Sequence, residues 1–137
     1  KCAEEFGSQA VVVAVDAKRV DGKMVCFAGA GKKKTDWQLG AWLSEAERQG
    51  AGEILLTSIE YDGMKKGFDI GMLQYACAKT ELPVIASGGC SSVADIVEVF
   101  KKTPASGALA ASIFHFGDIS VAECKRQLRE AGIEVRI

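Results

Sequence analysis

Several features are scarce in this chain of 137 residues. No apolar run approaches the roughly 18 residues of a transmembrane helix, so we expect no membrane span. Lys and Arg number 17 against 18 Asp and Glu, without the basic excess of nucleic-acid-binding or membrane-surface proteins. The chain begins with Lys1, not Met, and has no signal-peptide pattern, so we expect that upstream sequence has been removed.

Cysteine and histidine are also too few, and too irregularly spaced, for a metal centre. The five cysteines are odd in number and form no CxxC pair, so neither a disulfide framework nor a zinc site is expected. Reduced thiols favour a cytoplasmic protein without metal or cofactor. Cys77 and Cys124 fit core positions. His115, the single histidine, is interpreted as a packed or capping residue between Phe114 and Phe116.

What the chain does contain is an alternation of short apolar runs and helical patterns. The runs cover residues 10–15, 54–59, 83–87 and 108–111, and their lack of polar alternation is typical of buried parallel strands. Helical spacing follows at residues 42–46, 70–77 and 95–101, and a last helix lies between Ser120 and Gly132. An N-cap is expected at Ser91 or Ser92 and a capping box at Ser120 and Glu123, while residues 2–6 end another helix. The length fits a single α/β domain over residues 1–137.

One stretch breaks the alternation. Asp21-Gly22 between alternating apolar residues predicts a small β-hairpin inserted after the first strand. The segment 29–34 that follows is rich in glycine and lysine. It is either a solvated loop or a basic lid that faces a phosphate.

Ligands of parallel α/β folds bind at the carboxyl ends of the strands. Asp16 ends the first apolar run and is a candidate general acid or base. Its alternative role is a structural ion pair with Lys18 or Arg19. Gly88-Gly89 ends the third run and Ser112 follows the fourth, an arrangement that suits phosphate binding by backbone N–H groups. The alternative for the two glycines is a tight strand–helix turn.

Four segments resemble a known family. Residues 6–19, 52–58, 85–89 and 109–116 are similar, in order and spacing, to the C-terminal half of the cyclase subunit of imidazole glycerol phosphate synthase. The resemblance implies half of a (β/α)8 barrel, a (β/α)4 half-barrel with parallel strands. It also implies a lyase of histidine biosynthesis that takes ammonia from a glutaminase and a bisphosphorylated ribulosyl substrate. The products are imidazole glycerol phosphate and an aminoimidazole carboxamide ribotide.

The resemblance also implies roles for individual residues. Asp16 matches one of the family's two catalytic aspartates, and Thr57 and Ser87 match substrate-binding strand ends. Glu53, at the start of its strand, matches a charged ring at the ammonia entrance. The implied phosphate site consists of Asp62, Gly63, Gly88, Gly89, Ala111 and Ser112. The family's Asp-Arg-Asp-Gly-Thr loop reads Glu60-Tyr61-Asp62-Gly63-Met64 here.

A complete barrel of this type needs about 250 residues, so four strands of eight are expected in this chain. The chain is then a piece of a longer cyclase, a half that pairs with an identical copy or a complementary half-barrel, or a half that binds phosphate without catalysis. An uncovered apolar face and open strand edges favour self-association. We therefore expect a homodimer, with enzyme activity only where a second half completes the barrel.

Overall fold

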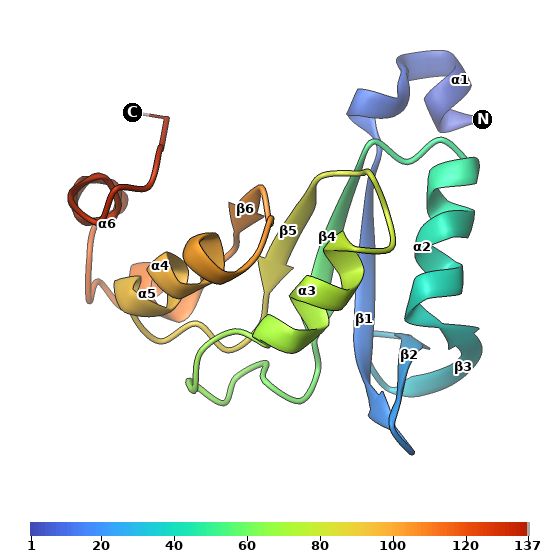
Figure 1. Ribbon diagram of the computed structural model, residues 1–137, viewed down its shortest axis with the longest axis horizontal. Coiled ribbons are helices and arrows are strands. Elements are labelled where there is room, and N and C mark those ends of the chain that lie inside the picture. The colour runs from blue at the N-terminus through green and yellow to red at the C-terminus, as the bar shows by residue number, and fades with distance from the viewer. Residues whose placement is uncertain (137) are drawn as a thin grey trace.

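The computed structural model describes residues 1–136 and contains one six-stranded, mostly parallel sheet in an α/β arrangement (Figure 1). The strand order is β3-β2-β1-β4-β5-β6. The strands are β1 (Val12–Val20), β2 (Lys23–Ala28), β3 (Lys33–Gln38), β4 (Glu53–Ser58), β5 (Val84–Ser87) and β6 (Gly107–Ala108). The helices are α1 (Cys2–Phe6), the 3-10 turn η1 (Ser8–Ala10), α2 (Leu39–Arg48), α3 (Ile70–Cys77), α4 (Val93–Lys102), α5 (Ser112–His115) and α6 (Val121–Glu130).

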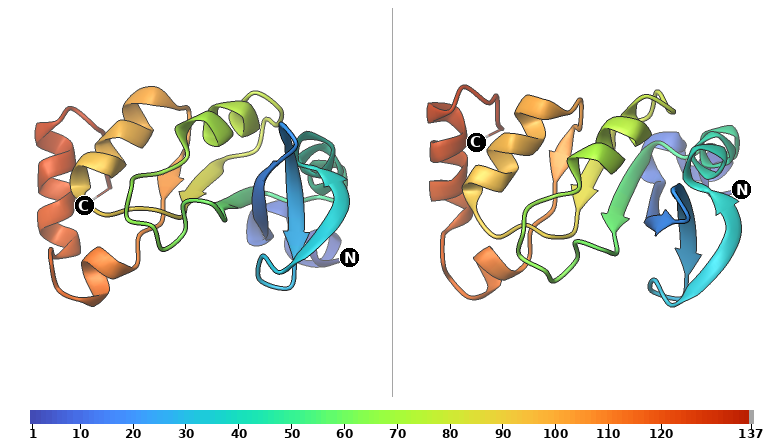
Figure 2. Two further views of the ribbon diagram at one scale, coloured as in Figure 1. Left: turned by 90° about the horizontal axis from the view of Figure 1, so that it is seen from below. Right: turned by 60° about the horizontal axis from the view of Figure 1, so that its bottom comes forward.

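Strands β1, β4, β5 and β6 form the parallel part of the sheet. Alternate residues of these strands face helices α2, α3 and α4, which lie on one side of the sheet (Figure 2). Ile54, Leu56 and Val84 are among the most buried of them, and they pack in one core with Leu43 and Val99 of the helices. The predicted strand–helix alternation is confirmed in this part, although β6 is shorter than the predicted strand at 108–111 because only Gly107 and Ala108 pair with β5.

The segment after the first predicted strand differs from the prediction. No separate hairpin is inserted there: β1 itself continues to Val20, and its residues 16–20 pair antiparallel with β2, which pairs in turn with β3. We call residues 16–38 the antiparallel arm. Asp21 and Gly22 have φ values of 49° and 75°, the backbone that a tight two-residue turn between twisted strands requires. The basic segment 29–34 is therefore the turn into β3, and Lys33 and Lys34 belong to that strand.

Helix ends follow local sequence signals. Ser92 caps α4, where its hydroxyl accepts from the N–H of Asp95 and the Asp95 carboxylate accepts from the N–H of Ser92, a complete capping box. At α6, Ser120 accepts from the N–H of Glu123 at 3.1 Å, which is half of the capping box that the sequence predicts there. Gly132 follows α6 with a φ of 81°, as predicted for its end.

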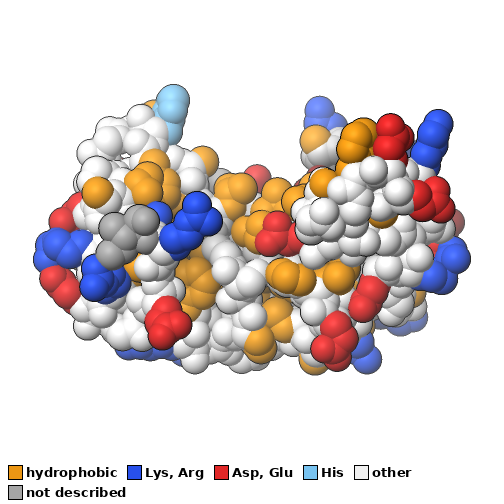
Figure 3. Space-filling model, turned by 90° about the horizontal axis from the view of Figure 1, so that it is seen from above, with side chains coloured by type: hydrophobic (Ala, Val, Ile, Leu, Met, Phe, Trp, Pro, Cys, Tyr) orange, Lys and Arg blue, Asp and Glu red, His pale blue; other side chains and the backbone are white. Residues whose placement is uncertain are grey.

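The face of the sheet opposite the helices is open over its middle within residues 1–136 (Figure 2). Val12 and Ala14 of β1 are exposed there, because they alternate with the buried Val15 and Ala17. Figure 3 shows a saddle between two raised ends of the molecule, with hydrophobic side chains gathered in it. Among residues 1–136, the helices are all too short or too polar to cross a bilayer.

Candidate functional site

Three of the predicted residues form a row across neighbouring strands. Asp16 of β1 is paired in register with Thr57 of β4, and Thr57 is paired with Ser87 of β5. Paired residues of adjacent strands point to the same face, so the three side chains lie on the open face near the carboxyl ends of the strands. They line a hollow of about 330 Å³, which we call the strand-end hollow, together with Ala30, Gly31, Ile59 and Asp62.

A second hollow, of about 180 Å³, adjoins the first and shares Asp62 and Ser87 with it. We call it the glycine-turn hollow. Its lining residues are Asp62, Gly63, Lys65, Ser87, Gly88, Gly89, Cys90, Leu109, Ala110, Ala111 and Ser112. All six residues of the implied phosphate site are therefore brought to one place, from three different strand–helix loops.

The two glycines of the turn are buried, and each is sterically required. A Cβ on Gly88 would lie 2.9 Å from the carbonyl oxygen of Ser58, and one on Gly89 would lie 2.1 Å from the carbonyl oxygen of Gly67. Both have positive φ values, 93° and 98°. The tight-turn alternative is thus correct for these glycines, and it is compatible with a hollow on their other side. Gly63 differs, because a Cβ there would meet no atom within 4 Å.

Asp16 forms no ion pair within residues 1–136, and the structural alternative for it is wrong. Arg19 instead pairs with Asp69, and the ammonium of Lys18 lies 4.9 Å from the ring centre of Phe27. The Asp16 side chain is half-buried beside Thr57, in an open hollow where a ligand can reach it. A carboxylate so placed can exchange a proton with a bound substrate.

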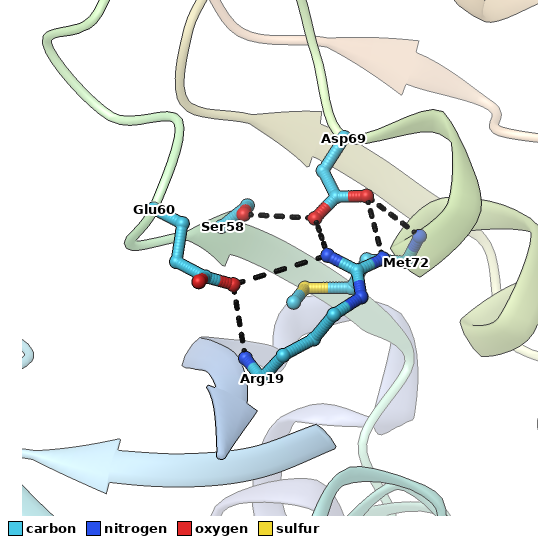
Figure 4. A network of polar contacts seen from close by, with 5 residues as sticks. All are labelled: Arg19, Ser58, Glu60, Asp69 and Met72. Atoms are coloured by element: carbon cyan, nitrogen blue, oxygen red, sulfur yellow. Dashed lines mark hydrogen bonds and ion pairs between the residues drawn. The ribbon is translucent and has the colours of Figure 1, made fainter. Parts of the chain in front are cut away.

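Sequence reasoning missed a polar network beneath the hollows. Arg19 donates to both carboxylate oxygens of Asp69, at 2.5 and 2.9 Å, and its backbone N–H donates to Glu60 at 3.0 Å (Figure 4). Burial by itself raises the pKa of Asp69, but hydrogen bonds from Arg19 and from the N–H of Met72 outweigh it and hold that pKa below its usual value. The one signal in the sequence was an aspartate directly before the predicted helix at residue 70, a typical N-cap.

Two other residues at the glycine-turn hollow were not predicted. Lys65 lines it, with a left-handed backbone (φ 51°) and its ammonium 6.0 Å from the ring centre of Phe116. Cys90 also lines it, but burial raises the pKa of this thiol to about 11, so the thiolate is scarce at neutral pH. Cys90 is therefore poorly suited to act as a nucleophile.

Glu53 lies apart from the hollows. It is the first residue of β4, at the amino end of the strand, in register with Val12. His115 is exposed, with its ring edge-on to Phe116 at 5.1 Å between centres, so it packs on one neighbouring ring rather than in the core. Residues 1–136 contain no group of three or more His, Cys, Asp or Glu side chains that could hold a metal ion.

Comparisons of the sequence with known proteins identify its family. The model of the histidine biosynthesis protein family matches residues 1–120. Subunit HisF of imidazole glycerol phosphate synthase from Streptococcus mutans is 53% identical over 136 residues, which is 98% of this chain and 54% of that protein. The same subunit from a Thermotoga species is 52% identical over 135 residues, which is 98% of this chain and 53% of that protein. The subunit from Bacillus cereus is 46% identical over 136 residues, which is 98% of this chain and 54% of that protein. The chain thus spans about half the length of these relatives.

Proposed function

The chain belongs to the histidine biosynthesis protein family, and on this premise we propose that it is the C-terminal half-barrel of a cyclase. The reaction converts a bisphosphorylated ribulosyl substrate and ammonia to imidazole glycerol phosphate and an aminoimidazole carboxamide ribotide. The similarity to HisF subunits along 98% of the chain is the observation that supports this most directly. Residues 1–137 would then be one (β/α)4 domain of TIM-barrel type.

Asp16 is the catalytic residue in this proposal. Its carboxylate lies in the strand-end hollow with Thr57 and Ser87, whose hydroxyls supply hydrogen bonds to the polar groups of the substrate. As a general acid or base, Asp16 moves a proton during ammonia incorporation and ring closure, a contribution of about 10²- to 10⁴-fold in rate.

One phosphate of the substrate binds in the glycine-turn hollow. Asp62 and Gly63 approach it from the loop after β4, Gly88 and Gly89 from the turn after β5, and Ala111 and Ser112 from the segment after β6, which supports the role of these residues. The adjoining position of the two hollows supports one substrate that spans both, with its phosphate beside Gly63 and its reacting end beside Asp16.

The half-barrel needs a second half. The outer edge of β1 is unpaired at residues 12–15, because β2 pairs only with residues 16–20. At the other edge of the sheet, β6 contains only two residues. Open edges on both sides of a curved, partly apolar face favour pairing with further strands. We propose that a second copy, related by a two-fold axis, or a complementary half-barrel completes the eight strands.

Two-fold pairing would restore what one half lacks. It would place a second Asp16 across the mouth of the barrel and a second glycine-turn hollow on the opposite side, which matches a substrate with two phosphates. Glu53, at the amino end of β4, would face the opposite opening, where ammonia enters and a glutaminase docks. The second candidate function, phosphate binding without catalysis, is favoured only if the assembled protein does not turn over substrate.

The decisive experiment is turnover of the ribulosyl substrate with an ammonium salt as the nitrogen source. We expect slow turnover by the assembled protein and a loss of at least about tenfold in Asp16→Asn. Asp36→Asn is the matched control, because Asp36 is an exposed aspartate on β3 that lines neither hollow. Equal rates in wild type and Asp16→Asn would exclude Asp16 as the acid or base. Phosphate binding without turnover in either protein would support the binding-only candidate.

A further inference from the structure

Arg19 connects the antiparallel arm to the loop that follows β4. This β4–α3 loop, residues 59–68, supplies Asp62, Gly63 and Lys65 to the glycine-turn hollow. The Arg19 guanidinium holds Asp69 just after the loop with two parallel hydrogen bonds of 2.5 and 2.9 Å (Figure 4). Its backbone N–H donates to Glu60, near the start of the loop, at 3.0 Å. One residue of β1 thus contacts both ends of the loop.

Further hydrogen bonds of Asp69 hold the two ends of the loop together. It is only 3% exposed, and it accepts from the hydroxyl of Ser58 at 3.2 Å and from the N–H of Met72 at 3.0 Å. Ser58 precedes the loop and Met72 lies in the first turn of α3. The strand before the loop and the helix after it are therefore joined through one buried carboxylate, which is paired with Arg19.

The backbone of the loop is unfavourable without such support. Lys65, which is not glycine, has a φ of 51°, and Gly63 and Gly67 have φ values of 72° and 87°. Left-handed backbone at a residue with a side chain persists only where surrounding contacts impose it. On the far side of the loop, the N–H of Gly67 donates to the carbonyl oxygen of Gly89 at 3.0 Å.

We propose that Arg19 and Glu60 are positioning residues, which hold the β4–α3 loop in the conformation that binds the substrate phosphate. This inference rests on the proposed function of the glycine-turn hollow. Arg19 lies three positions after Asp16 on the same strand, so the bonds that orient the phosphate loop begin on the strand of the catalytic aspartate. The same bonds set the distance between the bound phosphate and Asp16.

The charge of Glu60 provides a test, because charge repulsion and loop positioning predict opposite changes in phosphate affinity when Glu60 is removed. Glu60 is an anion on a loop that would bind an anion, so by Coulomb repulsion alone its removal tightens phosphate binding. If Glu60 positions the loop, its removal weakens binding instead. Glu98 is a matched control, because its side chain is 42% exposed against 40% for Glu60, and each forms one ion pair. Glu98 lies on α4 and its ion pair is with Lys102 of the same helix.

The experiment titrates inorganic phosphate into wild type, Glu60→Ala and Glu98→Ala by calorimetry, and follows amide hydrogen exchange of residues 59–68 in the same proteins. We expect Glu60→Ala to bind phosphate about five- to tenfold more weakly, the usual net effect of one lost hydrogen bond. We also expect faster exchange in the loop, with an unfolding midpoint close to that of wild type. Glu98→Ala should match wild type in both measurements. In the assembled enzyme, Glu60→Ala should raise KM more than it lowers kcat.

Arg19→Lys keeps the charge but removes the two parallel hydrogen bonds, and it should show the same two changes. Unchanged exchange in Glu60→Ala together with equal or tighter phosphate binding would overturn the inference. Absence of phosphate binding by the wild type would contradict the proposed function of the hollow instead. The exchange rates of residues 59–68 would then still decide whether Glu60 and Arg19 hold the loop.

Discussion

The carbonyl oxygen of Gly67 lies where a side chain on Gly89 would begin, since a Cβ on Gly89 would be 2.1 Å from that oxygen. The two residues belong to different loops, and the N–H of Gly67 donates to the carbonyl oxygen of Gly89 at 3.0 Å. The glycine turn is therefore pressed against the β4–α3 loop by direct backbone contact. Any substitution at Gly89 must push the two loops apart.

We predict that Gly89→Ala lowers the free energy of unfolding by at least about 2 kcal/mol, from the strain of positive φ and the overlap with Gly67. Gly63→Ala, with positive φ but no atom within 4 Å of the added Cβ, should cost only about 1 kcal/mol. Urea unfolding of the two variants measures the difference. Equal losses of unfolding free energy in the two variants would mean that the two loops can move apart at no cost in stability. Because a substitution at Gly89 should destabilise the fold more, Gly63 is the better position at which to test phosphate binding.

Stability in acid should depend on Asp69. The pKa of Asp69 in the folded protein is held below its unfolded value of about 3.9, so the unfolded state binds more protons in acid. The contribution of the Asp69 carboxylate to the free energy of unfolding is therefore lost as the pH falls below that value. Asp69→Asn should be less stable than wild type by about 1–3 kcal/mol near neutral pH, and the gap should narrow between about pH 5 and pH 3. Unfolding free energies across this range check the prediction, with Asp36→Asn as control. A gap independent of pH would contradict it.

The cysteines should differ in how fast they react with a thiol reagent. Burial raises the pKa values of Cys26 and Cys90 to about 11, so at pH 8 only about one thiol in a thousand is ionised at each position. Cys2 is exposed. We predict that Cys2 reacts first with a thiol reagent at pH 8, and that Cys26 and Cys90 react rapidly only in denaturant. Mass spectrometry of the modified peptides identifies the sites. Rapid modification of Cys90 in the folded protein would contradict the raised pKa of this thiol.

Self-association should depend on the open face of the sheet. Val12 is 51% exposed there, and Val12→Lys would place a charged side chain on the face that a second copy has to cover. We predict that wild type forms dimers or higher even oligomers at micromolar concentration and that Val12→Lys shifts them towards the monomer of 14.5 kDa. Tyr75→Lys is the control, because Tyr75 is 36% exposed on α3, on the helix-covered side.

Light scattering measures the molar mass of all three proteins. A stable, folded wild-type monomer would contradict pairing by identical copies and leave a complementary half-barrel as the second half. Equal shifts in Val12→Lys and Tyr75→Lys would show that the open face is not the surface of association.

Local sequence was sufficient to predict most of the helices and the parallel strands. Spacing of apolar residues and capping side chains act within one turn of helix, so Ser92 and Gly132 mark helix ends without reference to the rest of the fold. At the antiparallel arm the same reasoning was only partly right. The turn at Asp21 and Gly22 was recognised, but whether β1 continues to Val20 depends on pairing with β2, which periodicity within one segment does not reveal.

Residue patterns were enough to predict the order of the parallel strands and helices along the chain. Together with the family resemblance, they also supplied part of the lining of the two hollows, from Asp16 to Ser112, but not Lys65 or Cys90. The three-dimensional packing was needed to show which of those residues share a hollow and why Gly89 has to be glycine. It also showed that Arg19 pairs with Asp69, 50 positions away, rather than with Asp16. The physical reason is that a strand end or a helix cap depends on neighbours in sequence. A close backbone approach or a buried ion pair instead depends on how segments distant in sequence are packed together.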